Sequence, residues 1–278
     1  MINKIAFLGC GSMGEAILAG LVASGLAPSA AVVTVRRAER AEELAARHGV
    51  TAIAGAEEPE ANRLAVKGSD VVILGVKPVG IAALCREIAA DLHAGTVVIS
   101  VAAAVSLARL EAALPSDQPV IRAMPNTPLK VRRGVVALSA GTSTTGGQLA
   151  LGHEVFAGSG VVLDVPERQQ DGISAISGSG PAYVFYLAEA LAAAARGFGL
   201  DEDASRILAR ETVAGAGLML SEPGADPSVL RKAVSSPNGT TERAIATFDE
   251  RGLAGIVAAG AQAAAARAAA ITKELDGE

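Results

Sequence analysis

The sequence predicts two domains of different classes. Residues 1–165 are expected to form an α/β domain with a doubly wound parallel sheet, and residues 166–278 an all-helical domain. Three observations support this. The first half alternates short apolar runs with helical segments. A glycine-rich turn joins the first run to the first helix. After about Pro166 no strand pattern remains, and long alanine-rich segments follow.

The strands of the first domain are predicted from apolar runs. The early runs are continuously apolar, which is typical of parallel strands that helices cover on both faces. A helix over Met13–Ser24 follows the first run, and Gly25 is a plausible stop signal for it. The predicted strands are Lys4–Gly9, Ala31–Val35, Asp70–Val76, Thr96–Val101, Pro119–Met124, Gly134–Ser139 and Gly160–Val165.

The second domain is predicted to be helical throughout, because glycines and prolines divide it into helical segments without strands. The last segment is rich in alanine on several faces. This composition favours either simple helix stability or close helix packing across a subunit interface, and both interpretations remain open. The predicted helices are Pro181–Arg196, Asp203–Leu220, Pro227–Ala233, Thr240–Glu250 and Leu253–Leu275.

Composition excludes several classes of protein. The net charge of -5 and the pI of about 5.4 argue against a general nucleic-acid binder, which would carry a basic face. Two cysteines are too few for a disulfide framework, and no Cys/His spacing indicates a metal site. The uncharged stretch between Glu15 and Arg36 is interrupted by glycine and proline, so a helix, turn and strand are expected there and no membrane span. The N-terminus lacks a signal-peptide layout, and we expect a cytoplasmic protein.

The turn Gly9-x-Gly11-x-x-Gly14 predicts a dinucleotide site of Rossmann type, because it follows a strand and opens a helix. Gly9 would permit the tight turn, Gly11 the close approach of a pyrophosphate, and Gly14 the packing of helix on sheet. The pyrophosphate would then bind amides at the helix N-terminus. The alternative is an ordinary glycine-rich turn.

Arg36 and Arg37 favour NADP over NAD. An NAD enzyme would carry an acidic residue near this position, about 20 residues beyond the glycines, to bind the ribose hydroxyls. Guanidinium groups instead bind a 2′-phosphate through paired hydrogen bonds. We therefore expect NADPH to be preferred over NADH, unless these arginines are merely solvated. Lys77 and Pro78 follow the strand over Asp70–Val76 and could line the same cleft.

The second domain lacks the usual acid–base residues of dehydrogenases. It contains no His or Cys, and its lysines are Lys232 and Lys273. Hydroxyl groups gather instead in the glycine-rich segment Ser177–Tyr183 and in Ser235–Ile245, which reads SSPNGTTERAI. Free amides at the start of the latter helix would suit a carboxylate, although plain N-capping is the alternative. An imine substrate fits these groups, because its basic nitrogen needs little acid help.

Together these segments resemble the pyrroline-5-carboxylate reductase family over essentially the whole chain. The motifs that carry the resemblance are FLGCGSMG, GVKP, AMPNTP (Ala123–Pro128), GSGPAY (Gly178–Tyr183) and SSPNGTTERAI. The resemblance implies NAD(P)H-dependent reduction of the C=N bond of 1-pyrroline-5-carboxylate to L-proline, the last step of proline biosynthesis. It also implies a Rossmann domain followed by a helical dimerisation domain. The expected assembly is a homodimer that often builds larger rings, commonly decamers, with each active site where one subunit's cofactor domain meets a partner's helical domain.

The resemblance also implies roles for individual residues. Thr241 would hydrogen-bond the ring nitrogen of the substrate as the catalytic residue. The family usually has Gly-Gly after the proline of the signature, and Asn238 departs from this pattern, so the substrate affinity is open. The implied substrate-binding residues are Ser236, Asn238, Gly239, Thr240 and Thr241. The implied cofactor-binding residues are Gly9, Gly11, Ser12, Met13, Gly14, Asn62, Val76, Lys77, Pro78 and Ala103.

Two alternatives remain. A β-hydroxyacid-type dehydrogenase would need a catalytic lysine on the first long helix of the second domain, and Pro181–Arg196 contains none. A non-catalytic NADP-binding sensor is a protein of another class, and it would leave the two hydroxyl-rich segments without a purpose.

Overall fold

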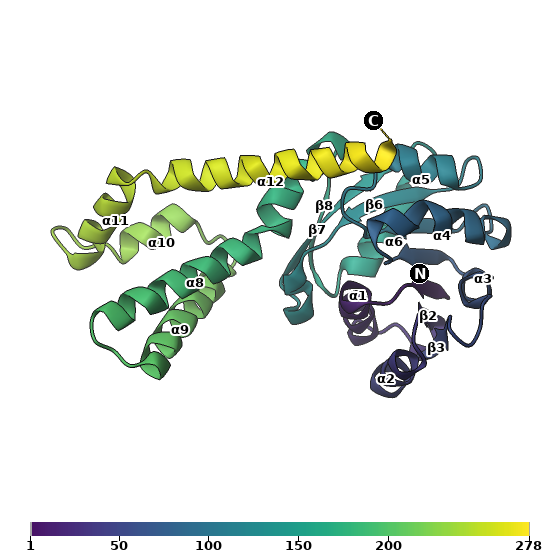
Figure 1. Cartoon of the computed structure of the whole chain (residues 1–278), viewed down its shortest axis with the longest axis horizontal. Helices are drawn as coiled ribbons and strands as arrows, with labels where there is room; N and C mark the ends of the chain where they lie inside the picture. Colours follow the sequence, from purple (N-terminus) through teal and green to yellow (C-terminus); the bar gives the residue numbers. More distant parts are fainter. Residues whose placement is uncertain (1, 278) are drawn as a thin grey trace. The chain divides into compact units, whose positions relative to one another are not determined.

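The computed structural model describes residues 2–277 and divides the chain into two compact units (Figure 1). The first unit comprises the residues up to Gly178 together with those from Ala264 on, and the second comprises Ser179–Ala263. The unit boundary thus lies beyond the domain boundary that we place at residues 165 and 166. The assignment of residues 166–278 to one functional domain stays a prediction.

The first unit is built on an eight-stranded sheet with the order β3-β2-β1-β4-β5-β6-β7-β8. All neighbouring strands are parallel except β6 and β7. The sheet order reverses direction between β1 and β4, where doubly wound sheets bind their ligands. The strands are β1 (Ile5–Leu8), β2 (Ala31–Val35), β3 (Thr51–Ala54), β4 (Val71–Leu74), β5 (Val97–Ser100), β6 (Val120–Met124), β7 (Gly134–Ala140) and β8 (Gly160–Asp164).

Helices cover both faces of this sheet, as the continuous apolar runs predict. In β1, Ile5 and Phe7 belong to one hydrophobic cluster, whereas Ala6 and Leu8 belong to the other. Successive strand residues point to opposite faces, so a strand that is buried on both faces must be apolar at every position. The helices of this unit are α1 (Ser12–Ala23), α2 (Ala38–His48), α3 (Ala61–Val66), α4 (Ile81–Ile88), α5 (Leu107–Ala113), α6 (Gly146–Phe156) and α7 (Gln170–Ile173).

Two features of the sheet differ from expectation. β3 is absent from the predicted strands, because it is a short edge strand of four residues with one buried position and lacks a continuous apolar run. The antiparallel pairing of β6 and β7 follows from their connection, which contains only the short 3₁₀ helix Thr127–Val131. A parallel pair needs a crossover of a dozen or more residues, whereas an antiparallel pair can be joined by a short link.

The second unit consists of helices that leave much apolar surface uncovered. Of its described residues only Ala192, Ser205 and Ala209 are buried. Large side chains such as Phe185, Leu208 and Ile256 are at least half exposed, and apolar faces of this extent mark contact surfaces. The helices are α8 (Gly180–Gly197), α9 (Glu202–Leu220), α10 (Pro227–Ala233), α11 (Thr240–Glu250) and the first part of α12 (Leu253–Asp276).

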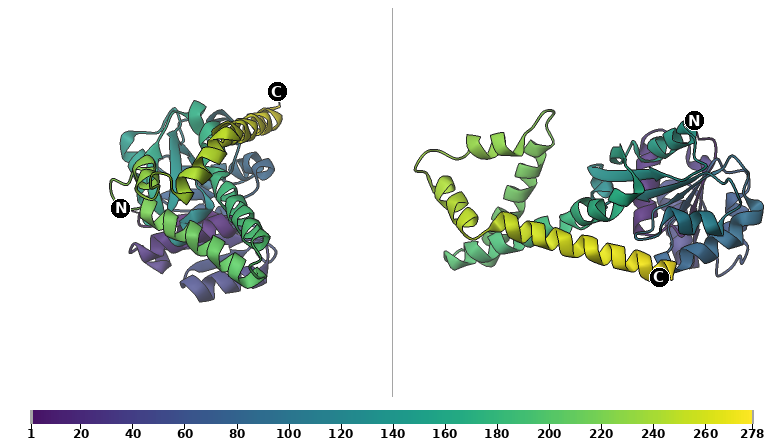
Figure 2. Two further views of the ribbon diagram at one scale, coloured as in Figure 1. Left: turned by 90° about the vertical axis from the view of Figure 1, so that its left-hand side faces the viewer. Right: turned by 90° about the horizontal axis from the view of Figure 1, so that it is seen from above.

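The C-terminal end of α12, which is one unbroken helix in Figure 2, belongs to the first unit. Leu275 packs against the cluster on one face of the sheet. The guanidinium of Arg109 donates to the carbonyl oxygen of Leu275 and lies 3.8 Å from Asp276. The hydroxyl of Ser106 donates to Asp276 at 3.0 Å. The end of the helix is therefore fixed to α5 by both apolar and polar contacts.

Candidate active site

The glycine turn after β1 has the geometry of a dinucleotide-binding loop. Gly9 adopts a φ of +76°, and a Cβ at this position would lie 2.5 Å from the side chain of Val76. Both the positive φ and the close approach exclude a larger residue here. Gly11 is exposed, and a Cβ there would meet only the carbonyl oxygen of Gly9 at 3.9 Å, which leaves space for a ligand above the turn.

A cavity of about 770 Å³ lies beside this turn, and we call it the cofactor cavity. It joins the glycine turn to the ends of β2 and β4, as expected at the carboxyl edge of a parallel sheet. Its wall carries four cationic side chains: Arg36, Arg37, Arg40 and Lys77. Among the described residues no carboxylate lies within ion-pair distance of Arg36 or Arg37, so both guanidinium groups are available to an anion.

Glu15, in the first turn of α1, forms hydrogen bonds with three basic side chains near this cavity. Its Oε2 accepts from Arg40 at 2.5 Å, and its Oε1 accepts from Arg47 at 2.5 Å and lies 3.1 Å from Nε2 of His48. Burial alone would raise the pKa of Glu15, but the hydrogen bonds from Arg40, His48 and Arg47 outweigh burial and lower it to about 2. Glu15 is therefore ionised at any physiological pH.

The other predicted cofactor residues occupy different places. Ser12 and Val76 line the cofactor cavity, whereas Met13 packs partly against the core. Asn62 lies behind the glycine turn, where its side chain accepts from the Thr34 hydroxyl at 2.7 Å and donates to Glu87. Thr34 in turn accepts from the backbone amide of Gly9 at 3.2 Å. The remaining three are Gly14, buried in α1, Pro78 at the start of a 3₁₀ helix, and Ala103, exposed after β5.

In the second unit, the loop before α11 forms the compact turn that its sequence predicts. Asn238 adopts a φ of +59°, so asparagine serves at this left-handed position, as its tolerance for such geometry predicts. Gly239 is the N-cap of α11, and a Cβ at this residue would lie 2.4 Å from the Ser236 hydroxyl oxygen. The side chain of Ser236 therefore lies close over Gly239.

The amides at this helix start are not all free. The amide of Gly239 donates to the carbonyl oxygen of Ser236 at 2.9 Å, and the amide of Asn238 donates to Oε2 of Glu242 at 2.6 Å. We expected free amides from residue 239 on. In this structure the amides of Thr240 and Thr241, in the first turn of α11, are among those that precede the first bond of the helix ladder, from the Arg243 amide to the Gly239 carbonyl oxygen, and they remain for a ligand.

Sequence reasoning missed three charged residues near these sites: Glu15, Arg40 and Glu242. Arg40 lies in the first turn of α2, three residues after the N-cap residue Arg37, and this closeness along the chain could have indicated it. Glu242 is the third residue of α11, where a carboxylate often binds amides at a helix start. Glu15 gives no such signal, because its partners are 25 to 33 residues away in the sequence.

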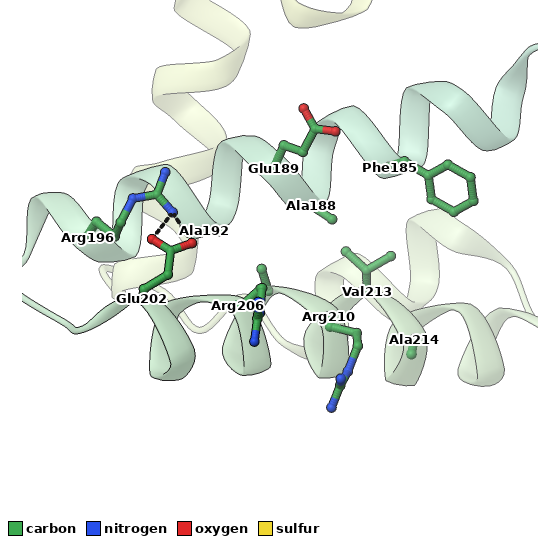
Figure 3. A pocket seen from close by; sticks show the side chains of 11 residues that line it. Phe185, Ala188, Glu189, Ala192, Arg196, Glu202, Arg206, Arg210, Val213 and Ala214 are labelled. Atoms are coloured by element: carbon green, nitrogen blue, oxygen red, sulfur yellow. Dashed lines mark hydrogen bonds and ion pairs between the residues drawn. The ribbon is translucent and has the colours of Figure 1, made fainter.

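A groove of about 660 Å³ lies between α8 and α9 (Figure 3). Alanines and Val213 form part of its lining, and the ion pair between Arg196 and Glu202, at 3.3 Å, lies at one end. Phe185, at the other end, is 63% exposed. A groove with alanines along it and an exposed aromatic side chain beside it suits contact with another helix.

Comparison with known proteins identifies related families for both parts of the chain. Residues 167–271 match the family model for pyrroline-5-carboxylate reductase dimerisation. Residues 4–104 match the family model described as NADP oxidoreductase, coenzyme F420-dependent. The pyrroline-5-carboxylate reductase of Corynebacterium melassecola is 38% identical and covers 98% of this chain and 100% of the relative. That of Pseudomonas aeruginosa is 34% identical and covers 98% of each.

Solved structures agree with these relatives. The structure of a pyrroline-5-carboxylate reductase from Coxiella burnetii aligns with a TM-score of 0.89 and 34% identity over 97% of this chain and 98% of that chain. A pyrroline carboxylate reductase from Plasmodium falciparum, solved with NADP bound, aligns with a TM-score of 0.82. At 22% identity over 97% of this chain and 98% of that one, the second likeness shows the fold alone.

Proposed function

The chain belongs to the pyrroline-5-carboxylate reductase family of NAD(P)-dependent oxidoreductases, and from this premise we propose that it reduces the C=N bond of 1-pyrroline-5-carboxylate to L-proline. The observation that carries the proposal is the whole-length identity with named reductases. The reaction is the last step of proline biosynthesis. The alternatives are not favoured: α8 contains no lysine for a β-hydroxyacid dehydrogenase, and a sensor would not need the hydroxyl-rich loop.

NADPH is the proposed cofactor, and it supplies the hydride when bound. The exposed glycine turn would receive its pyrophosphate, and Arg36 and Arg37 would hold its 2′-phosphate. Changing both arginines to Asp should raise the KM for NADPH at least about tenfold more than the KM for NADH, since each lost charge-assisted bond is worth roughly 1.5–3 kcal/mol. Steady-state kinetics with both cofactors measures the ratio. An unchanged ratio would show that these arginines are only solvated.

The loop before α11 is the proposed substrate site. The amides of Thr240 and Thr241, together with the Ser236 hydroxyl, would bind the carboxylate of the pyrroline, and Asn238 and Gly239 would shape the turn. The hydroxyl of Thr241 would hydrogen-bond the ring nitrogen and orient its proton. The imine carbon becomes electrophilic when that nitrogen is protonated, which explains how a site without histidine can serve the reaction.

The family match establishes an oligomerising domain, and we propose a homodimer, assembled further into a decamer. The exposed apolar side chains of α8, α9 and α12 would lie in this interface. α12 is also long and apolar enough to cross a membrane by length and composition, at a mean hydropathy of 1.3. We assign its apolar surface to subunit contact in a cytoplasmic enzyme, because the match to the dimerisation model extends through residue 271.

The proposed reaction is tested by following NADPH oxidation with 1-pyrroline-5-carboxylate, beside oxidation of a β-hydroxyacid with NADP⁺. Rapid oxidation with the imine, and L-proline as the product, is expected. Turnover of the hydroxyacid alone would assign the chain to the other dehydrogenase type. Cofactor binding without turnover of either compound would support the sensor.

A further inference from the structure

A second cavity lies along α1, beside the cofactor cavity but separate from its arginine-rich wall. Its volume is about 450 Å³, and we call it the flank cavity. α1, the end of α2 and the 3₁₀ helix Thr127–Val131 with the residue after it line it. Its polar lining residues are Ser12, Glu15, Arg47, His48, Lys130 and Arg132.

The charge of the flank cavity is predominantly positive. Arg47, Lys130 and Arg132 are cationic, and the His48 ring lies beside them. Glu15 is the one carboxylate among the lining residues, and it is already engaged by three donors. Over the part of the chain that the structure describes, no carboxylate lies within 4.0 Å of the Lys130 or Arg132 side chain. The cavity therefore holds more positive charge than its own carboxylate can balance.

The backbone of Arg132 ends the 3₁₀ helix Thr127–Val131 beside the cavity. Arg132 adopts a φ of +57° and a ψ of 30°, the left-handed region that normally favours glycine or asparagine. A left-handed residue is a common way to end a helix, and the amide of Arg132 donates to the carbonyl oxygen of Leu129 at 3.0 Å. Here the conformation accompanies a cationic side chain that lines the cavity.

Glu15 connects the two cavities through its two oxygens. Oε2 binds Arg40, which lines the cofactor cavity, whereas Oε1 binds Arg47 and His48, which line the flank cavity. An anion in the flank cavity would compete with Oε1 for Arg47. The charge state of one cavity is thus coupled to the other through a single carboxylate.

From these observations we propose that the flank cavity binds a multiply charged phosphoryl anion at a site distinct from that of the cofactor. The free diphosphate ion and the diphosphate group of a nucleotide share this chemistry. Arg132 and Arg47 would supply paired donors and Lys130 a compact charge, which is the combination that phosphoryl oxygens bind best.

The experiment is a calorimetric titration of pyrophosphate into the full-length enzyme that is already saturated with NADP⁺, so that Arg36 and Arg37 are occupied. About one equivalent should bind, and binding should weaken as ionic strength rises. The double variant K130Q/R132Q should bind at least about tenfold more weakly, because two cations are lost from the cavity. Arg133 is on the same loop but does not line the cavity, so R133Q should change the affinity less than about twofold.

A variant that binds pyrophosphate more tightly is a useful control, because misfolding can only weaken binding. E15Q removes the competing carboxylate and should tighten pyrophosphate binding about fivefold. Parallel titration with ADP distinguishes the sources: equal affinity assigns the site to the diphosphate alone, and tighter ADP binding assigns it to a nucleotide. Absence of binding to the NADP⁺-saturated wild type would overturn the proposal, as would equal losses in K130Q/R132Q and R133Q.

Discussion

At the scale of single residues, the two hydroxyls at the start of α11 have different proposed roles. Thr241 is half-buried in the first turn of α11, whereas Ser236 is exposed and lies over Gly239. A hydroxyl that orients the ring nitrogen would stabilise mainly the transition state. A hydroxyl that binds the carboxylate would stabilise the bound substrate and the transition state equally.

Replacing Thr241 by Ala should therefore lower kcat, and replacing Ser236 by Ala should mainly raise KM for the imine. Each change should cost about 1–3 kcal/mol, the value of a hydrogen bond to a charged group. Steady-state kinetics at saturating NADPH separates the two constants. Thr241→Ser is the matched control, because it retains the hydroxyl and should keep most of kcat. Wild-type kinetics in both alanine variants would refute these roles.

Sequence alone located the residues whose chemistry is local. The glycines after β1 and Asn238 were identifiable because turn geometry restricts residue type within a few positions. The pairing of Glu15 with Arg40, Arg47 and His48 was not predictable, because it requires α1 and α2 to lie side by side. The bond that occupies the Gly239 amide was also missed, because the course of the turn decides which amides remain free.

At the scale of elements, apolar periodicity predicted the buried strands and the long helices. α10 and α11 begin and end at the predicted residues, because a proline or threonine marks each start. β3 escaped detection because an edge strand needs no continuous apolar run. The antiparallel β7 could have been inferred from the short link that precedes it.

The contact between α1 and α2 should make stability depend on pH in the acid range. The pKa of Glu15 falls from 4.5 to about 2 on folding, so its ionisation stabilises the fold above pH 4.5 and the effect disappears as the pH falls through 2. Ionised Glu15 should add at most about 3 kcal/mol to the free energy of unfolding at pH 7. Urea unfolding at pH 7 and at pH 3 measures it, and Glu15→Gln should show a smaller loss between these values. An equal loss in wild type and variant would contradict this prediction.

At the scale of the whole molecule, the second unit lacks a core of its own and must be completed by association. Phe185→Glu places a charge beside the groove between α8 and α9, where subunit contact would have to bury it. We expect a smaller assembly by light scattering, with lower activity. Leu64→Glu is the control, because Leu64 is also an exposed apolar residue but belongs to α3, outside this unit. Retention of the wild-type mass by Phe185→Glu would exclude this groove from the interface.

Mixed assemblies test whether each active site draws on two subunits. Gly11→Ala should impair cofactor binding, and Thr241→Ala should impair chemistry. If a site combines one subunit's cofactor cavity with a partner's α11 loop, co-expression of the two variants restores one complete site in each mixed dimer. Activity above that of either variant alone is therefore expected. If each subunit works by itself, every site in the mixture stays defective.

The anchoring of α12 has a consequence for how the protein is made. Leu275 packs on the sheet, and Arg109 and Ser106 hold the last turn of the helix, so late residues complete a domain whose strands come early in the chain. During translation the surface that Leu275 covers, and the polar groups of Ser106 and Arg109, stay uncovered until these last residues have left the ribosome. Premature stop codons shortly before Leu275 should therefore yield nascent chains that depend on chaperones and are degraded quickly.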